Sequence, residues 1–297
     1  MLLEKYRVHL SRPDALVQLT FLGLLTGIFA GAVIVLFRLL VEESQGMLLP
    51  EGVAFNRENY EALSISARFL FPLAGSISIA VIFYFFAQGS HILGVAGVIK
   101  HMAFYQGYLS LRSFLLQFFT AAIALISGHS VGREGPNVFL GAASGSLLGQ
   151  GFSLPNNTIR ILVGCGSAAG IAASFDTPLA GVIFALEVIL MEYTLATFLP
   201  VILAAGSAAS LSVFVFGNEP AFVIPHIQQG ALIELPLVII LGLLAGTLSA
   251  LFIHLLQTLT HYSKAMNLTT RLLLSGVIMG LIAVIMPGVM GIGYDTL

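Results

Sequence analysis

Long apolar runs alternate with shorter, glycine-rich ones along this chain. A helix needs about 20 apolar residues to cross a lipid bilayer. Runs of roughly that length or more, each expected to form a spanning or buried helix, cover about 15–41, 66–87, 195–216, 235–257 and 270–287. The chain is therefore predicted to be all-α and to pass through a membrane several times.

The shorter runs change that picture. They lie at about 91–104, 112–127, 135–150, 158–174 and 178–192. Several look too short to cross a bilayer alone, and interrupted segments are tolerated in a membrane only where protein or a water-filled cavity surrounds them. The pattern favours tilted and broken helices over a bundle of straight spans.

Composition excludes several other classes of protein. The chain has 297 residues, of which 58% are hydrophobic and only 9% are charged, whereas soluble domains carry about 25% charged residues. A net charge of -2 gives no basic face for nucleic acid. The single cysteine, Cys165, excludes an intrachain disulfide, and no Cys/His pattern suggests a metal site. We expect no cofactor and no enzyme activity, because no nucleophile, metal cluster or phosphate loop stands in a suitable setting.

Charges in the loops predict the orientation. Lys5, Arg7 and Arg12 precede the first long run, whereas the 42–65 loop is acidic. Its charged residues are Glu42, Glu43, Glu51, Glu58 and Glu61, against Arg57 alone. The positive-inside bias places residues 1–14 in the cytoplasm and that loop outside, as in a multi-pass protein of the plasma (inner) membrane. Lys100, His101 and Arg112 then belong to a second cytoplasmic connection.

The chain also repeats itself. GLLTG at 23–27 recurs as GLLAG at 242–246, and ARFLFPLAGSISIAVI at 67–82 aligns without gaps with TRLLLSGVIMGLIAVI at 270–285. Apolar segments can match by chance, but two matches in the same order favour a real repeat. Internal repeats are a building plan of membrane transporters, whose substrate site lies at the repeat interface.

The repeat predicts a division of the chain. Residues 15–225 form a first transmembrane repeat, and 226–297 form the start of a second one that is cut short. In the ungapped alignment Leu297 corresponds to Gly94, so the partner of the segment after residue 128 would lie beyond the end.

Two charges stand inside a glycine-rich stretch, GHSVGREGPNVFLGAASGS, at 128–146. Pro136 suits the first turn of a helix, and Gly132 and Gly135 let the backbone approach a ligand. The first N–H groups of a helix lack internal partners, so a helix that begins inside a membrane can bind an anion. Glu134 would compete for that place and could gate it. Alternatively, Glu134 only caps the helix and pairs with Arg133.

This stretch and GCGSAAGIAASFDTPLAGVIFALEV at 164–188 closely resemble the CLC family of chloride channels and proton-coupled chloride transporters. The resemblance covers most of the chain, from about residue 15. It implies an inverted-repeat CLC-like fold and a homodimer with a separate pore in each subunit. It also implies that Glu134 is the gating glutamate and that Gly132, Arg133, Gly135 and Pro136 form the rest of its motif.

The resemblance implies a second anion-contacting segment near Leu93, Gly94 and Val95. The family's Gly-Ser-Gly-Ile-Pro motif should fall at 92–96, which reads ILGVA, so no serine hydroxyl is present. Backbone N–H groups could still bind the anion. Alternatively, 91–99 is the start of a buried apolar helix.

Proton coupling is left open by the second block. Proton-coupled members commonly carry another glutamate directly after the position of Glu187, where this chain has Val188. Glu187 and Glu192 are the candidates for another proton route, or Glu187 is a paired structural carboxylate. His129 could tune the pKa of the gate, although a hydrogen-bonded structural histidine is the simpler interpretation.

Three functions remain in competition. The leading one is transport of chloride or a similar small anion through a voltage-gated-chloride-channel-like path, gated by Glu134 and with no cofactor. The second is a proton-coupled chloride or fluoride antiporter. The third is a nonconducting fragment that lacks the later half of the anion site. The expected partners are a small inorganic anion, protons in the second case, the lipid bilayer and a second copy of the chain.

Overall fold

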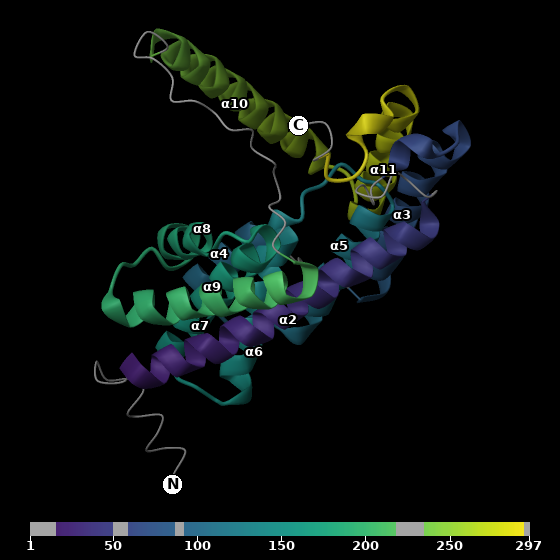
Figure 1. Cartoon of the computed structure of the whole chain (residues 1–297). Coiled ribbons are helices and arrows are strands. Elements are labelled where there is room, and N and C mark those ends of the chain that lie inside the picture. The colour runs from purple at the N-terminus through teal and green to yellow at the C-terminus, as the bar shows by residue number, and fades with distance from the viewer. Residues whose placement is uncertain (1–15, 50–58, 87–91, 218–234, 294–297) are drawn as a thin grey trace.

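The structure, a computed structural model, describes residues 16–49, 59–86, 92–217 and 235–293 (Figure 1). Its regular elements in these ranges are all helical. In chain order they are α2 (Leu16–Leu48), the 3-10 turn η2 (Tyr60–Ala62), α3 (Ile65–Phe86), α4 (Gly94–Phe104), α5 (Leu111–Ile126), α6 (Glu134–Gly151), α7 (Asn156–Phe175), α8 (Pro178–Phe184), η3 (Ala185–Leu190), α9 (Leu195–Phe216), α10 (Leu235–Ser263), α11 (Leu268–Ile285) and the 3-10 turn η5 (Pro287–Val289). The all-α prediction is confirmed. Residues 1–14, predicted to be cytoplasmic, lie outside the described ranges, as do Glu51, Arg57 and Glu58.

Six helices in the described part are long and apolar enough to cross a membrane: α2, α3, α7, α9, α10 and α11. Five of them coincide with the long apolar runs, so those predictions are confirmed and the chain is an integral membrane protein. The sixth, α7, was expected among the shorter segments, yet it has 20 residues. Its many glycines and alanines dilute the apolar signal, and most of the helix is buried among its neighbours.

The expected broken helices are present. The run at 178–192 forms one helix, Pro178–Leu190, that is irregular, because α8 changes at Ala185 into the π-helical turn η3. That turn ends at Met191, whose φ of 54° is left-handed. The α4 and α5 helices are also short, with 11 and 16 residues.

The acidic loop expected at 42–65 begins later than predicted. Glu42 and Glu43 belong to α2, which continues to Leu48. The guanidinium Nε of Arg38 donates to Glu42 Oε1 at 2.6 Å, and such a pair four residues apart stabilises a helix. This pairing explains why two acidic residues extend the helix and do not end it.

The centre of the molecule is a pair of helices, α6 and α7, that pack backbone against backbone. A side chain at Gly141 would overlap the carbonyl of Gly166, and one at Gly166 would overlap the carbonyl of Gly141. Further along, Gly145 faces Leu162 and Gly170 faces Asn137, so the two helices run antiparallel. Gly149 also contacts α7, so small residues along α6 let the two backbones approach closely.

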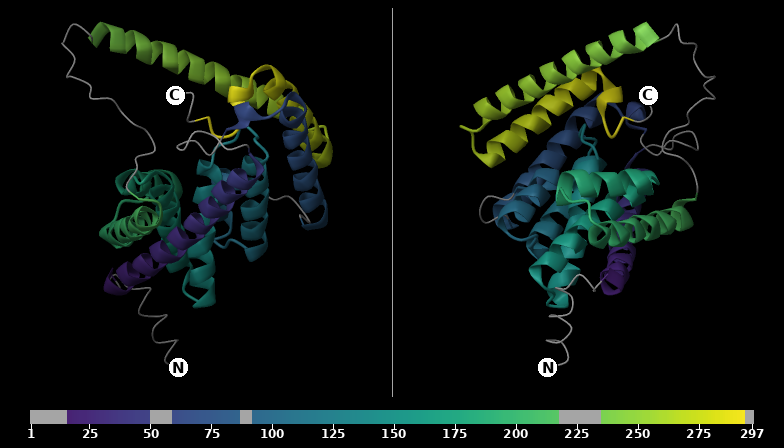
Figure 2. Two further views of the ribbon diagram at one scale, coloured as in Figure 1. Left: turned by 45° about the vertical axis from the view of Figure 1, so that its right-hand side comes forward. Right: turned by 90° about the vertical axis from the view of Figure 1, so that its left-hand side faces the viewer.

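A second glycine contact joins α2 to α9. Gly23 lies against Pro200 and Gly27 against Ala204, so these two helices run parallel. Together α2, α6, α7 and α9 enclose most of the buried apolar side chains. In contrast, α10 has no buried residue and lies at the edge of the molecule in both views of Figure 2.

The predicted repeat aligns helix α3 with helix α11. The ungapped alignment of 67–82 with 270–285 pairs Ile65, the first residue of α3, with Leu268, the first residue of α11. Where the helices touch, Gly276 lies against Ser76 and Gly280 against Phe69, so they run antiparallel. An inverted repeat would give its equivalent helices opposite directions, and the repeat itself stays a prediction.

The α6–α7 contact makes Gly141→Ala a test of this packing. The added methyl group meets the Gly166 carbonyl, so we expect the free energy of unfolding in detergent to fall by about 1–3 kcal/mol. The control is Gly206→Ala in α9, where a Cβ meets open space and alanine favours the helix. Equal midpoints of thermal unfolding for the two variants would contradict the close contact.

Candidate functional site

The charged glycine motif begins a helix, as predicted. Glu134 is the first residue of α6, Arg133 is its N-cap and Pro136 lies in its first turn. The side chain of Arg133 makes no capping hydrogen bond. The backbone N–H of Asn137 donates to the Arg133 carbonyl at 3.0 Å and closes the first turn. Because proline has no N–H, Pro136 adds no donor to this end.

The segment before α6 is anchored at the end of α5. Tyr60 is 1% exposed, and its hydroxyl donates to the Leu125 carbonyl at 2.8 Å. The amide Nε2 of Gln45 lies 3.0 Å from the same hydroxyl. Gly128, with φ 73°, packs under the Tyr60 ring. This buried network fixes the point at which the chain leaves α5 and turns towards α6.

His129 belongs to the same anchor. Its Nε2 lies 2.9 Å from the hydroxyl of Ser76 on α3, and its Nδ1 lies 2.9 Å from the hydroxyl of Ser127. Its backbone N–H donates to the Ala124 carbonyl at 3.0 Å. The histidine thus holds the loop between α3 and α5, which agrees with the structural interpretation of this residue.

The carboxylate of Glu134 folds back over Gly132. A Cβ at position 132 would overlap Glu134 Oε2, so a glycine is needed there for the carboxylate to take this place. The backbone of Gly132 is not left-handed, so the requirement comes from space and not from φ. Glu134 is exposed in this structure. Its charge therefore lies at the first turn of α6, where the helix dipole favours a negative group.

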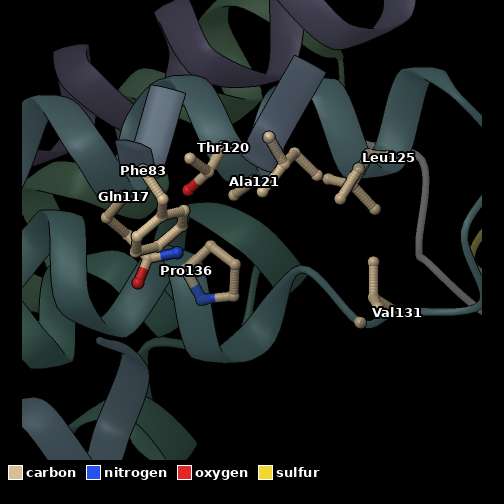
Figure 3. Close-up of a pocket in the computed structure, with 10 residues that line it drawn as sticks. Phe83, Gln117, Thr120, Ala121, Leu125, Val131 and Pro136 are labelled. Carbon is tan, nitrogen blue, oxygen red and sulfur yellow. The ribbon is translucent and has the colours of Figure 1, made fainter. Parts of the chain in front are cut away.

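A cavity of about 270 Å³ adjoins this turn (Figure 3). Its wall is mostly apolar and comes from α3, α5 and the start of α6. The lining residues are Ile79, Phe83, Gln117, Thr120, Ala121, Ala124, Leu125, Val131, Gly132 and Pro136. Two of the five motif residues, Gly132 and Pro136, thus line the cavity, and Glu134 reaches its edge through Gly132.

Gln117 joins this cavity to the other segment that was expected to contact an anion. Its side-chain oxygen Oε1 accepts the backbone N–H of Gly94 at 2.8 Å. Gly94 is the first residue of α4 and has a φ of 68°. The starts of α4 and α6 therefore both lie near Gln117 of α5, since Gly94 is hydrogen-bonded to it and Pro136 lines the same cavity.

The other sequence-predicted residues lie away from the cavity. The side chains of Leu93 and Val95 pack against the apolar core, which agrees with a helix start packed in apolar surroundings. Glu187 lies in η3 and Glu192 follows it, and both are exposed. A contact of any of these four residues with an anion or a proton stays a prediction.

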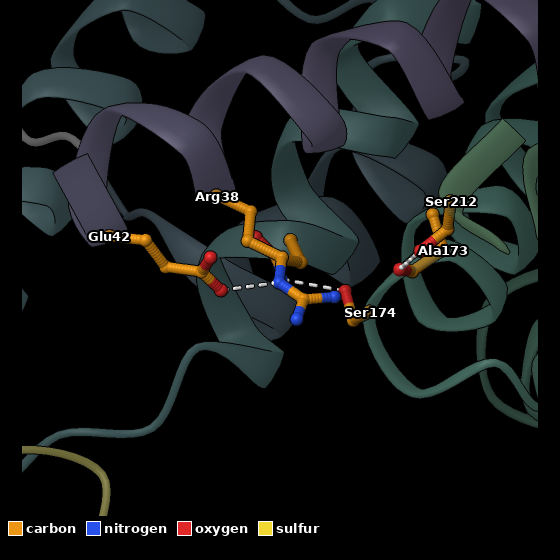
Figure 4. Close-up of polar contacts among 6 residues, drawn as sticks. Arg38, Glu42, Ala173, Ser174 and Ser212 are labelled. Atoms are coloured by element: carbon orange, nitrogen blue, oxygen red, sulfur yellow. Dashed lines mark hydrogen bonds and ion pairs between the residues drawn. The ribbon is translucent and has the colours of Figure 1, made fainter. Parts of the chain in front are cut away.

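The end of α7 is hydrogen-bonded to the first turn of α6. Asn137 Nδ2 donates to the Ser174 hydroxyl at 2.6 Å, and both residues are buried. The neighbouring carbonyl of Ala173 accepts from Ser212 of α9 at 2.8 Å (Figure 4). These bonds connect α6, α7 and α9, and Figure 4 also draws the Arg38–Glu42 pair of α2.

Sequence reasoning missed Gln117, Thr120 and Phe83. The available signal was an uncharged polar residue inside the apolar run at 112–127, because a glutamine or threonine there needs a polar partner or a cavity. Gln117 is 7% exposed and Thr120 is 6% exposed. Phe83 carries no such signal.

Comparisons with known proteins identify the family and agree with the fold. The sequence model of the voltage-gated chloride channel family matches residues 74–297. A ClcB-like protein of Ralstonia nicotianae is 32% identical over 241 residues, which is 79% of this chain and 56% of that protein. The ClcB chloride channel of Shigella boydii is 31% identical over 195 residues, or 64% of this chain and 46% of the channel. The chain spans about half the length of these relatives.

Solved structures show the same fold. A slow cyanobacterial Cl⁻/H⁺ antiporter superposes with a TM-score of 0.77 at 21% identity, covering 96% of this chain and 67% of the antiporter. A CLC-type fluoride/proton antiporter has the same TM-score at 23% identity, covering 96% of this chain and 70% of the antiporter. At these identities the likeness concerns the fold alone.

The buried network before α6 can be tested with Tyr60→Phe. Removal of the hydroxyl leaves the Leu125 carbonyl without this donor, so we expect the free energy of unfolding to fall by about 1–3 kcal/mol. The control is Tyr108→Phe, because Tyr108 is exposed and its hydroxyl bonds at 3.3 Å to Asn156. Thermal unfolding in detergent measures both. If Tyr60→Phe were no less stable than the control, the hydrogen bond from the Tyr60 hydroxyl would not stabilise the fold.

Proposed function

The chain belongs to the voltage-gated chloride channel family, and on this basis we propose that its protein carries chloride or a similar small anion across a membrane, with Glu134 as the gate. The supporting observation is the position of the Glu134 carboxylate, which lies over Gly132 at the edge of a cavity that begins at the first turn of α6. No cofactor is needed for this function, since the anion is the transported ligand.

The gate acts by competition. An anion in the cavity would be stabilised by the positive end of α6, and so is the carboxylate of Glu134. Protonation of Glu134 removes its charge, and a neutral carboxyl group interacts less with the helix end. The side chain can then swing away from Gly132 and leave the place to the anion. Conduction through this path rises when pH falls, because protonation favours the open position.

Proton-coupled exchange is the second candidate. The same movement of Glu134 would carry a proton if a second carboxylate supplied it from the other side of the membrane. Glu187 and Glu192 are exposed carboxylates close together in the chain and outside the cavity, which suits such a supply. Val188, between them, cannot relay a proton.

A nonconducting chain is the third candidate. The chain spans about half the length of the curated relatives it matches, and α10 has no buried residue. The remaining features of the proposal follow the family resemblance: a homodimer with one path in each subunit, voltage dependence, and the N-terminus on the cytoplasmic side of the plasma (inner) membrane.

Glu134→Gln tests the gate. The amide keeps the size of the side chain and cannot ionise, so we expect anion flux from liposomes to persist and to lose its dependence on pH. Any proton movement coupled to the anion should also disappear. Flux is measured with an anion electrode, with and without a pH gradient, and Glu61→Gln at an exposed site outside the cavity is the control.

Three results are informative in that experiment. Unchanged pH dependence in Glu134→Gln would remove Glu134 as the gate. Stoichiometric proton movement in the wild type would select the antiporter. No flux from a correctly folded wild-type protein would select the nonconducting chain.

Gly132→Ala tests the position of the closed gate. The methyl group takes the space of Glu134 Oε2, so we expect the carboxylate to be displaced and flux at neutral pH to rise towards that of Glu134→Gln. The double variant should add nothing to either single one, since both remove the same contact. Gly151→Ala, at the other end of α6 in open space, is the control. Additive effects on flux would show that Gly132 and Glu134 act independently.

A further inference from the structure

Gln117 is a buried amide whose two ends have different surroundings. It lies in the middle of α5, is 7% exposed, and is flanked in the chain by Leu116 and Phe118. A buried amide needs hydrogen-bond partners for both its oxygen and its nitrogen. The identity of these partners decides what the residue does.

The oxygen end is occupied. Gln117 Oε1 accepts the N–H of Gly94 at 2.8 Å, and this bond determines the orientation of the amide, because an N–H donor must meet the oxygen. The NH2 group then faces the opposite way. In Figure 3 it points into the cavity beside Pro136, and no acceptor for it is found among the described residues.

The cavity offers few other donors from side chains. Of the lining residues, Gln117 and Thr120 alone have polar side chains. The hydroxyl of Thr120 donates to the Leu116 carbonyl at 2.6 Å, so towards the cavity it can only accept. The proline at 136 has no N–H to offer. The Gln117 NH2 group is therefore the side-chain donor that this cavity presents to a ligand.

Through Gln117, the partial positive charge at the start of α4 also acts on the cavity. The Gly94 N–H belongs to the N-terminus of α4, where the helix carries partial positive charge. When the amide oxygen accepts this bond, the amide is polarised and its N–H groups become stronger donors. A helix start that does not itself line the cavity thus acts on it through one side chain.

We propose that the Gln117 NH2 group is a direct ligand of the anion and sets its affinity in this cavity. The inference rests on the proposed function, because it assigns a ligand within the same anion path. A neutral donor suits this position, since the anion must bind without being trapped.

Two substitutions are needed to test the ligand, because one keeps the cap of α4 but adds a charge and the other adds no charge but removes the cap. Gln117→Glu keeps the length of the side chain and an oxygen for the Gly94 N–H, but replaces the NH2 donor by a second acceptor oxygen. Gln117→Met removes both ends without adding charge. The control is Gln150→Met in α6, because the Gln150 amide donates to the Leu109 carbonyl and the Ser146 hydroxyl outside the cavity.

Bromide is the probe. We expect calorimetric titration of the purified protein with bromide to give about 10- to 100-fold weaker binding for both Gln117 variants and no change for Gln150→Met, as follows from the loss of one hydrogen bond to a charged ligand. Crystals grown in bromide should show an anomalous peak in the cavity, about 3.3 Å from Gln117 Nε2.

The outcomes distinguish the two proposals. If Gln117→Glu bound bromide as tightly as the wild type, Gln117 would only cap α4 and this inference would be wrong. A bromide peak elsewhere in the protein, and not in the cavity, would also overturn it. In both cases anion flux through the wild type would leave the proposed function standing. No bromide binding and no flux in the folded wild type would overturn both.

Discussion

The site depends on one constraint: a helix that begins among apolar groups must find hydrogen-bond acceptors for its first N–H groups. Two helices of this chain, α4 and α6, begin near the same cavity. At α4 the partner is the amide oxygen of Gln117, which bears no titratable proton. At α6 a carboxylate, that of Glu134, lies in the first turn. The amide of Gln117 does not ionise, whereas the carboxyl group of Glu134 does, which is why the proposed function assigns the gate to α6.

The first turn of α6 has a fixed position because glycines let this helix pack directly against α7. Gly141 and Gly166 bring the backbones of α6 and α7 into contact, so the position of α6 is set by main-chain atoms and not by flexible side chains. Asn137 adds a buried hydrogen bond to Ser174 in the first turn itself. A movement of the Glu134 side chain can then occur without movement of the helix that carries it.

Much of this arrangement was predictable from local patterns. The apolar runs predicted the spanning helices, and the Gly-Arg-Glu-Gly-Pro sequence predicted a helix start, because glycine and proline punctuate helices in a defined way. The role of Gln117 was not predictable, since it depends on Gly94, 23 residues earlier, and on the wall formed by α3. Glu42 was misplaced for a related reason: its pairing with Arg38 changes an acidic residue from a loop signal into a helix-stabilising one.

The repeat shows that the same sequence pattern can occur in helices that pack differently. GLLTG at 23–27 and GLLAG at 242–246 carry glycines at the same spacing. In α2, Gly23 and Gly27 lie against α9, whereas a Cβ at Gly242 or Gly246 of α10 would meet open space. Each glycine inside a helix is destabilising by about 0.5–1 kcal/mol relative to alanine, and lipid offers no compensation. The same five-residue pattern thus occurs in two helices, and in α2 the structure shows the helix that packs against it.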